Sequence, residues 1–202
     1  MGKQTEKTLQ TKTDLIEAFW QLYKEMPINK ITVKDITNRA GYYRSTFYNY
    51  FDDVYAVLND IEASVLQDWE DILSTAFHEK YKVLIYKDIQ IIINLIIPFY
   101  EKNGEYIAVL LSPNGDPTFQ KKIKSTLRQK LFVLLEIPPH TLEAELMFEC
   151  ISSGILGLFV KWYNDKLPPS MVETIIQKML DKDILSLMLC YSGNPLLKQF
   201  TP

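Results

Sequence analysis

The run GYYRSTFYNYFDD, residues 41–53, holds the side chains of this sequence best suited to chemistry. Arg44 can donate two hydrogen bonds to the acceptors on a guanine edge, and Ser45 and Thr46 are adaptable donors to several bases. Phe47 and Phe51 are instead expected to face inward and to hold the segment on a core. The run therefore predicts a short helix that turns polar side chains toward a nucleic acid.

Residues 61–202 contain no pattern typical of a catalytic site: G-x-S-x-G, the P-loop, G-x-G-x-x-G and H-E-x-x-H are all absent. The two histidines have no cysteine nearby, so we expect no metal and no cofactor. Cys150 and Cys190 are read as small core hydrophobes, with a disulfide or redox site as the minor alternative. We do not expect an enzyme.

Three helices must position the polar run. Apolar residues with helical spacing precede Pro27, and they are Leu15, Ile16, Phe19, Trp20, Leu22 and Tyr23. Thr32 and Asp35 form a capping-box pattern that begins a second helix, and Gly41 ends it. A short helix comes next, at about 44–50. Helices joined by a tight glycine turn predict a helix-turn-helix, whose last helix enters the major groove with its N-terminal residues at the base edges.

The rest of the chain also reads as helical, and we predict an all-α fold of about nine helices. Asp52 and Asp53 favour the start of a long helix, at about 53–79. Breakers divide the remaining residues into helices near 83–101, 104–111, 117–136, 140–164 and 169–190. We place a DNA-binding domain at 1–60 and a second helical domain at 61–202. The division falls near residue 60, inside the long helix, so we expect a rigid connection.

Charge is distributed unevenly, although the chain as a whole carries a net charge of −3. Residues 1–51 carry eight basic and five acidic residues, and the remainder carries fourteen and twenty. The N-terminal end is where a polyanion could dock, but the asymmetry is mild and decides nothing alone. The N-terminus is polar, and the apolar run Ile89 to Tyr100 is too short to span a bilayer. We expect a cytoplasmic protein with no membrane partner.

The segment ITVKDITNRAGYYRSTFYNYFDD resembles the DNA-binding signature of TetR-type (TetR/AcrR) transcriptional regulators. The resemblance covers roughly residues 9–60 and is carried by Thr32-Val33, Ile36, Ala40-Gly41, Ser45 to Tyr48 and Phe51. LLSPNGDPTF and GILGLFVKWY, further along, are similar to a subgroup from Gram-positive (Firmicutes) bacteria. The resemblance implies a regulator that binds double-stranded DNA, most simply a palindromic operator read by a homodimer.

The resemblance also implies which residues meet DNA, with Tyr48 reaching a phosphate. The DNA-binding positions are Thr32, Lys34, Tyr43, Arg44, Ser45, Thr46, Tyr48, Asn49 and Tyr50. Two positions depart from the family pattern: Tyr43 replaces the usual small cap, and Val54 replaces a common basic residue. For Tyr43, packing at the helix start and contact with a base or sugar both stay open.

A dimer surface is expected on the helix that contains SSGILGLFVKWY. Gly154 and Gly157 lie on neighbouring turns and allow another backbone to approach closely, while Leu158 adds apolar area. Close packing within one chain is the alternative for these residues. A two-fold dimer would place its two recognition helices one duplex turn apart, about 34–36 Å.

An effector pocket is expected in the middle of the chain, where Pro98 lies inside an apolar helix and should kink it. The candidate lining residues are Asn94, Tyr100, Tyr106, Phe119 and Trp162. A plain aromatic core is the alternative.

The leading hypothesis is a dimeric repressor released from its operator by a small-molecule effector. One alternative is a TetR-like activator that works through a protein partner. The other is a helical interaction protein that no longer reads DNA, which Val54 and the low overall charge favour.

Overall fold

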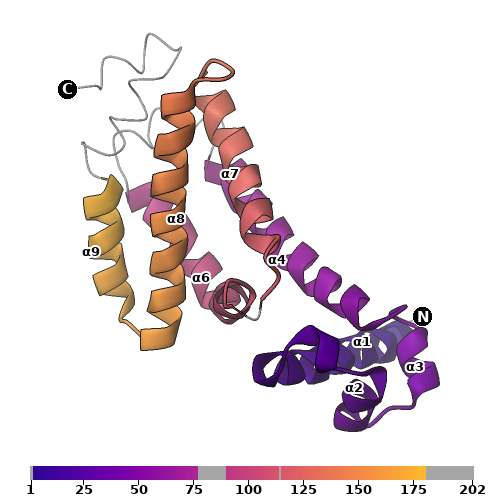
Figure 1. The fold of residues 1–202 in the computed structure, drawn as a ribbon. Helices are drawn as coiled ribbons and strands as arrows, with labels where there is room; N and C mark the ends of the chain where they lie inside the picture. Colours follow the sequence, from indigo (N-terminus) through magenta and orange to yellow (C-terminus); the bar gives the residue numbers. More distant parts are fainter. Residues whose placement is uncertain (1, 77–89, 114, 181–202) are drawn as a thin grey trace. The chain divides into compact units, whose positions relative to one another are not determined.

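The computed structural model describes residues 2–76, 90–113 and 115–180, and this part of the chain is built from helices (Figure 1). It contains eight α-helices and no strand, which confirms the all-α prediction. The helices are α1 (Gly2–Glu25), α2 (Val33–Ala40), α3 (Arg44–Tyr48), α4 (Val54–Ala76), α6 (Gln90–Leu110), α7 (Phe119–Leu134), α8 (Leu142–Asp165) and α9 (Pro169–Leu180). Within the described ranges, no helix combines the length and apolar character needed to cross a membrane.

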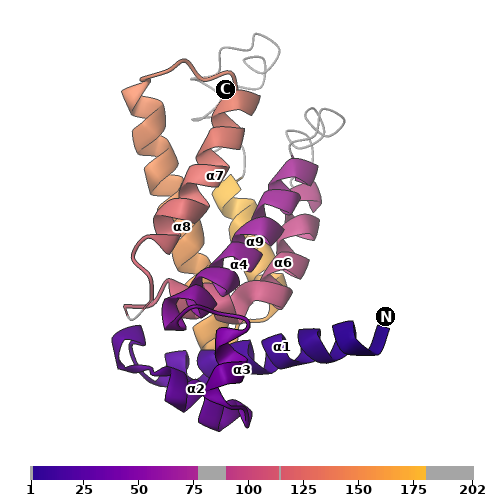
Figure 2. The ribbon, with the colours of Figure 1, turned by 90° about the vertical axis from the view of Figure 1, so that its right-hand side faces the viewer.

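The chain divides into two compact units inside α4, after Val65. Unit 1 comprises Met1–Val65 together with Pro113–Gly115, and unit 2 comprises the remainder. In unit 1, α1 packs against α2, and α2 packs against α3 (Figure 2). The side chains buried most completely in this unit come from all four of its helices, and they include Leu15, Phe19, Ile36, Phe47 and Val57. Helix α3 is therefore attached to a core much larger than itself.

Local sequence signals set the bounds of α2. The backbone N–H of Asp35 donates to Thr32 Oγ1 over 3.2 Å, and the N–H of Thr32 donates to Asp35 Oδ2 over 3.0 Å. This reciprocal pair is the predicted capping box, which satisfies donors left free at a helix start. Gly41 ends the helix with φ of 75°, a left-handed conformation that glycine adopts without strain. Both predicted signals are confirmed.

Unit 2 joins the second half of α4 to α6, α7, α8 and α9. The indole N–H of Trp69 donates to the backbone carbonyl of Ile123 over 3.2 Å, so α4 is tied to α7. The Asn103 amide donates to Asp68 over 3.0 Å, and Lys102 Nζ lies 2.7 Å from the same carboxylate, so α4 is also tied to α6. Helix α6 packs in turn against α8 and α9.

The predicted break at Asn103-Gly104 is wrong, because α6 runs unbroken from Gln90 to Leu110. Asn103 is buried, and its amide is occupied by Asp68 rather than by a turn. Gly104 lies against the ring of Tyr100, where an added Cβ would come within 2.9 Å of Cζ. Gly104 therefore allows the Tyr100 ring to pack closely against the backbone, and it does not end the helix.

The expectation that Cys150 is a core residue is also wrong, since it is exposed. The residue lies on α8 with Leu142 and Leu146, spaced four residues apart, and both leucines are exposed as well. One long face of α8 is thus left uncovered by the described residues. Cys190 lies outside the described residues.

Candidate nucleic-acid interface

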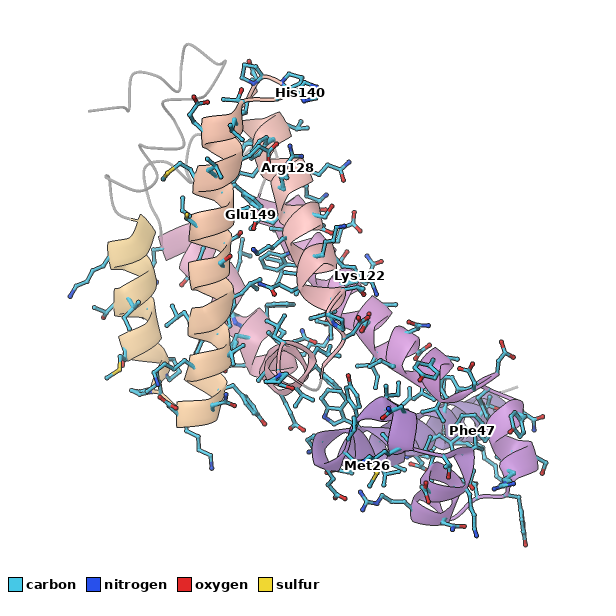
Figure 3. All side chains as sticks on the ribbon, viewed as in Figure 1. Met26, Phe47, Lys122, Arg128, His140 and Glu149 are labelled. Carbon is cyan, nitrogen blue, oxygen red and sulfur yellow. The ribbon has the colours of Figure 1, made fainter. Side chains whose placement is uncertain are left out.

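Helix α3 presents its polar side chains because one ring anchors it. Phe47 has no exposed surface, and its ring centroid lies 5.7 Å from that of Phe51 in the core of unit 1. Figure 3 labels Phe47 within this unit. With Phe47 inward, Arg44 and Ser45 on the first turn are exposed, and Tyr48 is 58% exposed. The predicted base-reading residues therefore lie on the free side of the helix.

A hollow of about 420 Å³ brings α2 and α3 together at this surface. Its walls are Lys34, Thr37, Asn38, Tyr42, Tyr43 and Arg44. Three of the predicted DNA-binding residues, Lys34, Tyr43 and Arg44, thus share one concave site. Two of its walls are cationic and none is anionic, so the hollow has the charge needed to attract a phosphate.

Tyr42 fixes the turn between the two helices. Its hydroxyl donates to Asp14 Oδ2 on α1 over 2.7 Å. That bond, joined by one from Gln10, holds the pKa of Asp14 below its ordinary value, and the same bond raises the pKa of Tyr42. The carboxylate is therefore ionised near neutral pH and accepts a hydrogen bond from the Tyr42 hydroxyl, which attaches the turn before α3 to α1.

Tyr43 is the most exposed large residue of the surface, with 84% of its area accessible. It occupies the N-cap of α3 but makes no capping hydrogen bond with its side chain. Of the two uses expected for it, packing at the helix start is not what the structure shows. The exposed ring is one wall of the hollow, where a partner can contact it.

Asp35 reduces the positive charge near the hollow without lining it. Hydrogen bonds from Thr32 lower the pKa of its carboxyl, and the charges of Lys34 and Arg44 lower it further. Asp35 is held in the capping box and orients α2, and its charge weakens the attraction of the hollow for a phosphate. Val54, where the family pattern has a basic residue, is buried at the start of α4 and belongs to the core.

The remaining residues predicted to contact DNA differ in how exposed they are. Thr32 is exposed, but its hydroxyl is bonded to Asp35. Asn49 is exposed, whereas Thr46 and Tyr50 are half-buried. Sequence reasoning missed Asn38, an exposed amide that lines the hollow. Its position four residues after Lys34 was the available signal, because that spacing places two residues on one helix face.

The residues proposed for dimer contact lie on α8. Gly154 and Gly157 are exposed, and a Cβ built on Gly157 would meet no atom within 4 Å. Leu158 is half-buried. Close packing within the described chain, the alternative considered for the glycines, is therefore not seen at Gly157. The same helix face exposes Leu142 by 65% and Leu146 by 58%, so it is apolar at one end.

The residues proposed for an effector pocket are only partly brought together. The Tyr100 and Trp162 rings are stacked with centroids 3.7 Å apart, and the Tyr100 hydroxyl donates to the carbonyl of Phe159 over 3.2 Å. Burial raises the pKa of Tyr100. Phe119 is fully buried, whereas Asn94 is exposed on α6. Tyr106, half-buried, completes the proposed set.

Comparison with known proteins adds a family match to this geometry. Residues 87–182 match the TetR-type family model described as "Transcriptional regulator C-terminal region". No curated protein and no solved structure matches the chain. The match lies beyond residues 9–60, which carry the motif resemblance, so two separate segments point the same way. Together they support a transcriptional regulator of the TetR type.

Proposed function

We propose that the chain is a DNA-binding transcriptional repressor that acts as a homodimer on a palindromic operator and is released by an effector. The α2–α3 pair is its helix-turn-helix, with α3 as the recognition helix. Arg44 and Ser45 read base edges, while Lys34 and Tyr48 bind phosphates on either side. Tyr43 contacts the sugar or base beside the hollow.

The hollow between α2 and α3 is the observation that carries this proposal. It joins Lys34 and Arg44 from two helices at one concave surface, with the exposed Tyr43 ring as one of its walls. Rigid support comes from Phe47 in the core and from the bond between Tyr42 and Asp14. A cationic surface with several hydrogen-bond donors and fixed geometry suits a duplex, whose phosphates lie at regular spacing.

Dimerisation is proposed from the exposed face of α8. Among the residues that the structure describes, two leucines, a cysteine and two glycines are exposed along one side of a helix of 24 residues. Apolar residues aligned in this way mark an association surface more often than a free one. A two-fold contact there would supply the second recognition helix that a palindrome requires.

Release by an effector requires that the ligand prefer one conformation of unit 2. The aromatic cluster of Tyr100, Phe159 and Trp162 connects α6 to α8. A ligand that separates these rings would alter the packing of both helices. We propose this cluster as the wall that an effector displaces.

The test begins by sequencing the genomic fragments that the purified protein retains, which supplies an operator. Fluorescence anisotropy on that operator should then show affinity that falls steeply with salt. Arg44→Ala should weaken binding, while Arg39→Ala is the matched control, because Arg39 pairs with Glu25 at 3.3 Å and does not line the hollow. Equal effects of both substitutions, or no retained fragment, would refute the proposed reading surface. Reporter output with and without the protein distinguishes repression from activation.

A further inference from the structure

A second hollow, of about 400 Å³, lies on unit 2 where α7 and α8 run side by side (Figures 1 and 2). Its walls include Gln120, Lys121, Lys124, Arg128, Phe148 and Glu149. We infer that this hollow binds a small organic anion, one with a phosphate or carboxylate group and an apolar body. The inference concerns binding and does not depend on how unit 1 reads DNA.

Helix α7 supplies the positive charge. Its sixteen residues include five lysines and arginines and no carboxylate. Lys121, Lys124 and Arg128 succeed one another at spacings of three and four, so they share a helix face. That face opens into the hollow, whereas Glu149 from α8 is the acidic residue in its lining. The lining therefore carries a net positive charge.

Two of the three cations are held in place by neighbours. Lys124 has a side chain only 12% exposed, and its ammonium lies 2.6 Å from Glu149 Oε2 and 2.7 Å from Ser153 Oγ. The Arg128 guanidinium donates to both oxygens of Glu145. Both heads are thus oriented before any ligand arrives, which reduces the entropy lost on binding.

Lys121 and Glu149 leave the hollow able to accept an anion. Lys121 is exposed and forms no ion pair with any residue in the described ranges. The Glu149 side chain is 58% exposed, so it can turn into solvent when an anion approaches Lys124. An incoming phosphate or carboxylate would then meet the ammonium groups of Lys121 and Lys124, beside an Arg128 guanidinium that is already paired with Glu145. Charge-assisted hydrogen bonds of this kind are stronger than neutral ones.

The shape of the hollow is set by the way α7 and α8 pack. Near the loop that joins them, the helices share an apolar cluster that includes Leu131, Leu135, Ala144 and Phe148. Nearer the start of α7, the residues that line the hollow include the charged side chains of Lys121 and Lys124. Figure 3 shows Arg128 and Glu149 along this strip between the two helices. Phe148, only 2% exposed, and Pro117 also line the hollow, so apolar surface lies beside its cationic residues.

The hollow is partly open to solvent, so its volume limits only the part of a ligand that it encloses. Each water-sized group occupies about 30 Å³ in the liquid, so the hollow has room for roughly a dozen of them. A ring system with one charged substituent fits this limit. We therefore choose 2-naphthyl phosphate as the probe, with 2-naphthoate to separate phosphate from carboxylate recognition and neutral 2-naphthol to measure what the charge contributes.

Binding is measured by isothermal titration calorimetry on the full chain. We expect a 1:1 stoichiometry per chain and at least tenfold weaker binding of 2-naphthol than of the phosphate. Lys121→Gln should weaken phosphate binding at least threefold. Lys122→Gln, one residue along the same helix, removes the same charge and should leave binding within twofold, because Lys122 lies near Asp116 and does not line the hollow.

The double variant Lys121→Gln/Lys124→Gln should weaken binding at least tenfold, with folding checked by circular dichroism. The double variant could unfold because Lys124 is partly buried. Lys121→Glu is therefore the second variant, since it reverses a charge at an exposed position and keeps the test valid. The inference is overturned if the parent shows no binding at millimolar probe, if 2-naphthol binds as tightly as the phosphate, or if Lys121 and Lys122 variants behave alike.

Discussion

Replacing Gly157 by leucine should break the proposed dimer without harming the folded chain. In the structure an added Cβ at this position meets nothing within 4 Å, so a larger side chain has space in the single chain. Leucine is also the better helix former, by about 0.8 kcal/mol in a helix interior. The isolated chain should therefore be as stable as the parent or slightly more stable. Any loss of dimerisation must therefore come from a surface that the single chain does not cover.

The effect on association can be estimated from two-fold symmetry. A contact of α8 with its copy places each substitution in the interface twice, once from each chain. Forcing extra methylenes into a packed contact costs about 1–3 kcal/mol at each position. The sum of about 2–6 kcal/mol raises the dimer dissociation constant roughly 30-fold to 10⁴-fold. A dimer with a dissociation constant of about 1 nM would thus have one between roughly 30 nM and 10 μM after the substitution.

Sedimentation velocity over a range of micromolar concentrations measures this change directly. Gln129→Leu is the matched control, because it places the same side chain at an exposed position of α7, away from the α8 face. Thermal unfolding of both variants checks that the fold is retained. If Gly157→Leu sediments as a dimer with the concentration dependence of the parent, the interface lies elsewhere and the reasoning from the exposed glycine is wrong.

Three further predictions concern single contacts. Arg44→Ala should cost on the order of 1–3 kcal/mol of binding free energy per half-site and reduce the preference for operator over random duplex in anisotropy titrations. If affinity falls equally for operator and random duplex, Arg44 contacts only a phosphate. Thr32→Ala should lower the free energy of unfolding in urea by about 0.5–2 kcal/mol. The Asp35 pKa is lowered in the fold, so its stabilisation is present above about pH 3.9, the ordinary value, and is lost as pH falls through the folded pKa. The stability difference between parent and variant should therefore narrow in acid, and the part that remains is the bond from the Asp35 N–H to Thr32 Oγ1, which does not titrate. Gly104→Ala brings a Cβ within 2.9 Å of Tyr100 Cζ, which should cost about 1–3 kcal/mol of strain, while alanine favours the helix by about 1 kcal/mol. The free energy of unfolding should therefore fall by up to about 2 kcal/mol. A higher melting temperature would show that the ring moves aside at no cost.

Features that depend on near neighbours in the chain were predictable from the sequence. The capping box at Thr32 needs only a residue three positions later, and the end of α2 needs only a glycine able to adopt positive φ. The inward direction of Phe47 is set by its place in a short amphipathic helix. Each of these features depends on interactions within one or two helical turns, so the local pattern of residue types is enough to predict it. The location of the polar surface on α3 is a consequence of them.

Features that depend on residues far apart in the chain were decided only by the tertiary structure. Asn103-Gly104 has the composition of a turn, but Asp68, thirty-five residues away, takes the amide and keeps α6 continuous. Cys150 has the character of a core residue, yet the face of α8 on which it lies is not covered by the described residues. Both hollows form where side chains from two helices meet. The physical reason is common to all of them: helix periodicity specifies which residues share a face, whereas the partner of that face depends on how distant segments pack.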